Sequence, residues 1–122
     1  MAYLNQDNKN AKQAPALSFA YELIVAITNE GCTDMVMNAA RAAGARGGTT
    51  LHGKGTGEKD PRFYNITLAE EKEVVLIVAA AEQKSEIMTS IIKKAGPDTE
   101  AGTIAFSLPT TEVAGFGLLE AN

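Results

Sequence analysis

The residues best suited to chemistry lie between Gly44 and Gly57, in the sequence GARGGTTLHGKGTG, which holds six of the 11 glycines of the chain. Glycine lacks a Cβ atom, so such a run predicts positive φ angles or a close approach of the backbone to another group. Exposed backbone N–H groups in a glycine-rich loop form concave anion sites, and Lys54 adds a compact positive charge. The segment therefore predicts a site for phosphate or another small anion.

Two nucleotide-binding motifs can be excluded at this segment. Residues Gly48 to Lys54 fit the phosphate-loop pattern G-x-x-x-x-G-K, but Gly55 stands where a Ser or Thr would bind magnesium. The motif also requires a helix next, whereas residues 58–62 predict a loop. The dinucleotide fingerprint G-x-G-x-x-G fails as well, because an acidic residue occupies the position of its last glycine.

The chain has one histidine, His52, and one cysteine, Cys32. Any histidine-based metal site or nucleophilic dyad would depend on His52, which shares a strand face with Thr50 and is predicted to be a solvated or interface residue. Cys32 follows Gly31 at a predicted helix start, where a thiolate can be stabilised, but we interpret it as a small buried residue.

Length and charge limit the class of protein. The 122 residues fit one domain, and a net charge of -4 argues against nucleic acid and anionic membrane surfaces as partners. No signal peptide and no apolar run of about 18 residues is found, which predicts a cytoplasmic protein without membrane insertion. Residues 1–18 are predicted to be a flexible tail, and residues 19–122 the folded domain.

The first half of the domain predicts the elements that position the glycine segment. A strand rich in β-branched residues covers Glu22 to Ile27, and a helix capped by Thr33 follows and ends at Gly44. Thr49 to His52 then forms a second strand. The apolar face of the helix is predicted to comprise Met35, Val36, Ala39, Ala40 and Ala43.

The second half repeats this order with a strand over Glu73 to Ala79, a helix over Ser85 to Ala95 and a strand over Thr103 to Leu108. The apolar residues of this helix are Ile87, Met88, Ile91 and Ile92. Two βαβ units predict an α+β, ferredoxin-like fold, a four-stranded antiparallel sheet with two helices on one face. Residues 23–27 and 74–78 are apolar on both strand faces, so self-association is predicted to cover the face without helices.

The order and spacing of these elements resemble the PII signalling protein superfamily over nearly the whole chain after Ala20. The matching elements are the strand 22–27, the helix end Ala-Ala-Gly-Ala, the Gly53-Lys54-Gly55 strand exit, the long polar loop before Glu73 and the segment 104–116. The resemblance implies a homotrimer with ligands bound between subunits. It also implies that residues 56–71 form a loop that docks onto a membrane transporter or a metabolic enzyme.

The resemblance further implies which residues bind the ligand: Gly47, Gly53, Lys54, Gly55, Thr56, Gly102 and Thr103. Nucleotide-binding members use a lysine before the last strand and arginines near the C-terminus. This chain has Asp98 and Glu100 in the first region and Gly115-Phe116-Gly117 in the second. Several charge-assisted contacts are therefore missing, so we expect no tight binding of ATP. The ligand stays unknown at this point, with AMP, ADP or a smaller anion as candidates.

The loop contains a predicted docking cluster, Arg62, Phe63 and Tyr64, because arginine and aromatic residues are enriched at the centre of interfaces. The residues around Tyr64 do not match those around the tyrosine that some PII proteins have modified by a nucleotidyl group. We therefore expect Tyr64 to act in contacts.

The leading hypothesis is a non-enzymatic regulator, related to nitrogen regulation, that senses a metabolite and reports it through residues 56–71. One alternative is a small ferredoxin-like enzyme that acts on an acyl or phosphate ester with His52, Glu58, Asp60 and Arg62. Another is a metal-responsive trimer resembling the CutA proteins, in which a threefold axis would gather three copies of His52 or Cys32.

Overall fold

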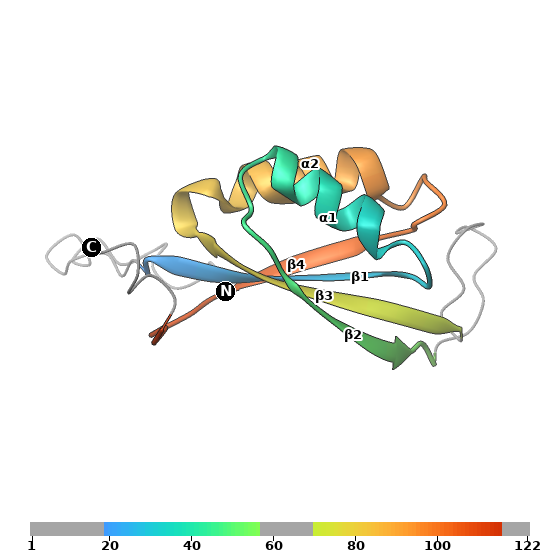
Figure 1. Ribbon diagram of the computed structural model, residues 1–122, viewed down its shortest axis with the longest axis horizontal. Coiled ribbons are helices and arrows are strands. Elements are labelled where there is room, and N and C mark those ends of the chain that lie inside the picture. Colours follow the sequence, from blue (N-terminus) through green and yellow to red (C-terminus); the bar gives the residue numbers. More distant parts are fainter. Residues whose placement is uncertain (1–18, 57–69, 116–122) are drawn as a thin grey trace, which may run out of the picture.

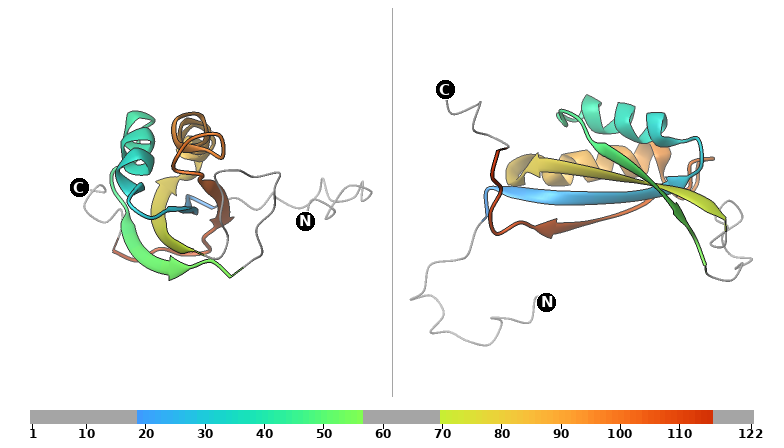
Figure 2. Two further views of the ribbon diagram at one scale, coloured as in Figure 1. Left: turned by 90° about the vertical axis from the view of Figure 1, so that its right-hand side faces the viewer. Right: turned by 60° about the horizontal axis from the view of Figure 1, so that its bottom comes forward.

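The computed structural model describes residues 19–56 and 70–115. The elements follow the order β1 (Tyr21–Asn29), α1 (Thr33–Ala42), β2 (Thr49–Lys54), β3 (Glu71–Ala80), the short 3-10 helix η3 (Ala81–Gln83), α2 (Lys84–Ala95) and β4 (Ile104–Pro109). The strand order is β2-β3-β1-β4, and every neighbouring pair is antiparallel. Helices α1 and α2 lie side by side on one face of the sheet (Figures 1 and 2). The predicted ferredoxin-like fold is confirmed.

The central strands are longer than their apolar runs predict. The ladder between β1 and β3 extends from the pair Tyr21 and Ala80 to the pair Asn29 and Lys72. Polar end residues carry no hydrophobic signal, yet they continue the strand because the neighbouring strand satisfies their backbone groups. As a result, Asn29 and Lys72 lie directly opposite each other across the two central strands.

The core lies between the helices and the sheet. Its sheet side consists of Ile24, Ala26, Val75, Ile77 and Ala79, and its helix side of Val36, Met37, Ala39, Ala40, Ile87, Ile91 and Ala95. Of the four apolar residues named in the predicted second helix, Ile92 lies outside the core and is 41% exposed. Residues Ile87, Ile91 and Ala95 recur every four positions and form the buried stripe, so Ile92 lies one step around the helix from it.

The helix ends only partly follow the predictions. Thr33 is the first residue of α1 and not its N-cap; Cys32 takes that position, with no side-chain capping hydrogen bond. The helix starts one residue too early for the Thr33 hydroxyl to act as a cap. At the other end, Gly44 has a φ of +111° and its N–H donates to the carbonyl of Arg41 at 3.0 Å. This left-handed residue ends α1 as predicted.

The glycine segment differs from a loop with positive φ angles. Of its described glycines, only Gly44 has a positive φ. Gly53 pairs with Lys72 in the ladder between β2 and β3. The N–H of Gly55 donates to the backbone carbonyl of Glu70 at 2.9 Å. A close approach does occur at Gly48, where a Cβ atom would lie 2.9 Å from the Leu76 carbonyl oxygen. Gly53 and Gly55 therefore continue the sheet, and the predicted concave anion loop is absent at these two glycines.

Candidate functional site

The face of the sheet away from the helices is apolar on all four strands. Strand alternation and register place these side chains on one surface, the open face: Leu23, Val25, Ile27, Leu51, Val74, Leu76, Val78, Ile104, Phe106 and Leu108. Phe106 is 45% exposed, and Leu51, Ile104 and Leu108 are exposed to a similar degree. No helix or strand of residues 19–56 and 70–115 covers the open face, which lies opposite the two helices (Figure 2).

A hollow of about 340 Å³ lies at one end of the open face, where β2 ends and β3 begins. We name it the Lys72 hollow; it is lined by Ile27, Gly53, Lys54, Gly55, Thr56, Lys72, Val74 and Ile104. The structure thus brings together four of the predicted ligand residues, Gly53 to Thr56. The β2–β3 register places them there, because Gly53 lies opposite Lys72 and Leu51 opposite Val74.

Lys72 is the residue of this hollow that sequence reasoning missed. Its side chain is only 6% exposed, and its Nζ donates to Asn29 Oδ1 at 2.6 Å. Among the described residues the ion pairs are His52–Glu73 and Lys84–Glu22, so Lys72 is not paired with a carboxylate there. A buried ammonium in a hollow lined by no carboxylate favours an anion. The available signal in the sequence was a lysine near the start of an apolar strand.

Lys54 lies between two hollows of opposite character. Strand alternation directs it away from Gly53 and toward the face that carries its register partner Glu71. A second hollow, of about 540 Å³, is lined by Lys54 with Asn29, Glu30, Glu70 and Glu71. Three carboxylates against one ammonium disfavour an anion in that second hollow. Lys72, and not Lys54, is therefore the better-placed cation for an anionic ligand.

Gly47 lies apart from the Lys72 hollow. It lines a separate hollow of about 360 Å³, together with Arg46, Gly48, Thr49, Leu76 and Val78. Gly53 is six positions after Gly47, a span of about 20 Å at about 3.3 Å per position of extended chain. A small ligand therefore cannot contact both glycines of the same chain.

Gly102 and Thr103 are buried behind the sheet end. The Thr103 side chain is 0% exposed, and its hydroxyl donates to Thr28 Oγ1 at 3.1 Å. The Thr28 hydroxyl in turn donates to the carbonyl of Ala101 at 2.9 Å. This chain of hydrogen bonds holds residues 101–103 against β1. The Thr103 side chain therefore has a structural role in the buried interior.

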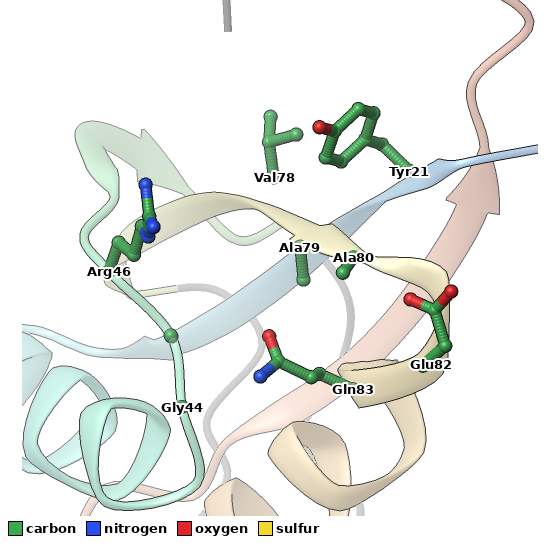
Figure 3. A pocket seen from close by; sticks show the side chains of 9 residues that line it. Tyr21, Gly44, Arg46, Val78, Ala79, Ala80, Glu82 and Gln83 are labelled. Carbon is green, nitrogen blue, oxygen red and sulfur yellow. The ribbon is translucent and has the colours of Figure 1, made fainter. Parts of the chain in front are cut away.

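Another hollow, of about 330 Å³, lies near the opposite end of the central strands (Figure 3). Tyr21, Arg46, Glu82 and Gln83 supply its polar side chains, and Val78, Ala79 and Ala80 its apolar ones. Sequence reasoning did not single it out, since its residues come from the start of β1, the α1–β2 connection, the end of β3 and η3. It is separate from the Lys72 hollow, with which it shares no lining residue.

Cys32 and His52 do not form a reactive pair. Burial raises the pKa of the Cys32 thiol, and the charges of Glu100 and Glu73 raise it further. His52 has a side chain that is 76% exposed, with Nδ1 3.7 Å from Glu73 Oε2. In residues 19–56 and 70–115, no three His, Cys, Asp or Glu side chains are grouped so that they could hold a metal ion. The raised pKa favours the thiol form of Cys32.

Several predicted features lie outside the described residues. These are the tail 1–18, the docking cluster Arg62, Phe63 and Tyr64, and the polar residues Glu58 and Asp60 of the enzyme hypothesis. Of residues 56–71, the structure describes Thr56, Glu70 and Glu71. No helix in the described part of the chain is long and apolar enough to cross a membrane.

The fold and the hollow together define a double βαβ domain with an apolar open face and a cationic site at one end of its sheet. The family model of the nitrogen regulatory protein P-II matches residues 21–116, and the chain belongs to this family of regulatory proteins. Among solved structures, it is similar to Arabidopsis thaliana PII bound to citrate. The two share 21% sequence identity with a TM-score of 0.63, over 83% of this chain and 84% of the other. No curated protein matches the chain.

Proposed function

We propose that this protein is a non-enzymatic, P-II-type regulator that binds a small anionic metabolite in the Lys72 hollow. The observation that carries the proposal is Lys72 itself, a buried ammonium on the open face without a carboxylate partner among the described residues. In an environment of low dielectric constant, such a charge attracts an anion more strongly than a solvated lysine does. Burial of the apolar walls Ile27, Val74 and Ile104 in an assembly would exclude water and strengthen the attraction.

The ligand that fits this chemistry is a compact organic anion. The similar Arabidopsis protein has citrate bound, which supports a carboxylate as one candidate. AMP and ADP are further candidates, because a monophosphate or diphosphate can also pair with Lys72. Asp98 and Glu100 lie in the connection before β4, and their negative charges oppose a triphosphate.

We further propose that the protein is a homotrimer whose subunits cover each other's open faces. An apolar surface that involves all four strands is typical of an interface, and burying it would remove the exposed Phe106, Ile104 and Leu108 from water. In such an assembly, Gly47 of one subunit can lie near the Lys72 hollow of another. Gly47 and Gly53 could then contact the same ligand, although they are too far apart to do so within one chain. The ligand site would then be an intersubunit cleft.

Signal output is assigned to residues 56–71, which begin at the Lys72 hollow with Thr56. A ligand that contacts Gly53 to Thr56 would fix the base of this segment and change the population that can dock. The proposed targets are a membrane transporter or a metabolic enzyme in the cytoplasm, in keeping with nitrogen regulation. Hydrogen exchange of residues 56–71 with and without ligand would measure this response.

The ligand site is tested by Lys72→Met, with Lys93→Met on the exposed surface of α2 as the matched control. Calorimetric titrations would use citrate, 2-oxoglutarate, bicarbonate, AMP and ADP. We expect Lys72→Met to weaken binding by about 10- to 100-fold, since a hydrogen bond to a charged group contributes about 1.5 to 3 kcal/mol. Lys93→Met should bind like the wild type. Equal affinities of Lys72→Met and wild type would refute this site.

A further inference from the structure

Asn29 holds Lys72 in a defined position. The two residues are opposite each other at the end of the β1–β3 ladder, and the Nζ to Oδ1 distance is 2.6 Å. The backbone N–H of Asn29 points away from β3 and donates to the carbonyl of Ala101 at 2.9 Å. In a cross-strand pair without backbone hydrogen bonds the side chains come closest, which allows this short contact.

The Asn29 side chain is itself oriented by the connection before β4. Its Nδ2 donates to the carbonyl of Glu100 at 3.0 Å, so the amide oxygen is left to face Lys72. Only this orientation of the amide satisfies a carbonyl acceptor on one side and an ammonium donor on the other. The side chain therefore links Lys72 to the turn at residues 99–102 through two hydrogen bonds.

A neutral partner has a different effect from a carboxylate at this position. An aspartate would accept the same hydrogen bond but would also neutralise the ammonium, and it could not donate to the Glu100 carbonyl. The amide orients the ammonium and leaves its full charge for a ligand. A lysine has three N–H donors, so two remain for an anionic ligand.

We propose that Asn29 is a positioning and specificity-determining residue for the anion site, because it fixes the ammonium of Lys72 without cancelling its charge. This inference rests on the proposed function, since it assumes that the hollow binds an anion. It adds two points. Asn29 acts through Lys72, and an aspartate at position 29 would be incompatible with tight binding of an anion.

The test compares Asn29→Asp and Asn29→Ala with Asn38→Asp, which makes the same chemical change at an exposed position of α1. Calorimetric titrations with citrate, AMP and ADP would be run at low and high salt. Asn29→Asp should weaken binding at least about tenfold at low salt and flatten its salt dependence, because the net charge of the site is lost. Asn29→Ala should weaken it severalfold but keep the salt dependence, because the ammonium remains. Asn38→Asp should match the wild type.

A purely structural role of Asn29 would change the melting temperature without changing the salt dependence of binding. The double variant Lys72→Met/Asn29→Asp separates the two cases: if Asn29 acts through Lys72, the aspartate should cause little further loss of affinity. Wild-type affinity and salt dependence in both Asn29 variants would overturn the inference and leave the proposed function intact. A wild-type protein that binds none of citrate, 2-oxoglutarate, bicarbonate, AMP and ADP would overturn both.

Discussion

At the residue scale, Cys32 illustrates how surroundings change a group that the sequence presents as ambiguous. It lies at the N-terminus of α1, where a thiolate is usually stabilised. Partial burial dominates, however, and the carboxylates of Glu100 and Glu73 add to it, so the pKa of the thiol is raised above its ordinary value. The thiolate fraction at neutral pH is therefore smaller than that of a free cysteine.

We expect alkylation of Cys32 to be slower at neutral pH than that of a free thiol and to accelerate as the pH rises toward the raised pKa. Glu100→Gln removes one of the charges that raise the pKa, so the rate profile should move to lower pH. Glu86→Gln, on the exposed surface of α2, should leave the profile unchanged. Rates of iodoacetamide labelling across a pH series measure this, and an unchanged profile for Glu100→Gln would contradict the electrostatic account.

At the scale of the elements, the two helices end in different ways although each has an Ala-Gly pair at its C-terminal end. Gly44 adopts a left-handed conformation after α1, whereas Gly96 has an ordinary φ of -78° after α2. A Cβ atom on Gly96 would lie 2.2 Å from the carbonyl oxygen of Ile92. Glycine is therefore required at position 96 because a Cβ atom would collide with the helix. At position 44 it is required because the backbone is left-handed.

Gly96→Ala should lower the free energy of unfolding by about 3 kcal/mol or more, because the backbone of α2 has to move to accommodate the methyl group. Gly31→Ala is the matched comparison: its Cβ would meet no atom within 4 Å, but its φ is +84°. The left-handed conformation alone should cost about 1 to 2 kcal/mol. Urea denaturation measures both, and a larger loss for Gly31→Ala would show that the contact at Gly96 relaxes easily.

At the scale of the whole molecule, the open face is the dominant feature. Its apolar side chains extend over all four strands, and the helices cover only the opposite side (Figure 1). A single chain would leave this surface in water, which is unusual for a stable monomer. Burial of the open face in an assembly would offset that cost.

Phe106→Asp should prevent assembly, because a carboxylate at the centre of an apolar interface is left without a partner. Ile92→Asp is the matched control, since Ile92 on α2 has nearly the same exposure, 41% against 45%. Light scattering coupled to size-exclusion chromatography should give the mass of three chains for the wild type and Ile92→Asp, and of one chain for Phe106→Asp. A monomeric wild type would refute the trimer.

The sequence alone determined the order of the elements and the fold, because strand and helix periodicities are local properties of the chain. It also indicated the apolar open face, since residues 23–27 and 74–78 lack the alternation of a strand with one solvated side. The helix ends were less well predicted. Whether Thr33 caps α1 depends on a shift of one residue, which local composition does not resolve.

Only the tertiary structure decided which cation faces the candidate site. Lys54 stands among the glycines and attracted attention in the sequence, whereas Lys72 opens an apolar strand in the second half. The β1–β3 register places Lys72 opposite Asn29, and the β2–β3 register places it opposite Gly53. Both pairings join segments far apart along the chain. The charge, burial and hydrogen bonding of the site depend on these non-local contacts, for which a single sequence has no periodic signal.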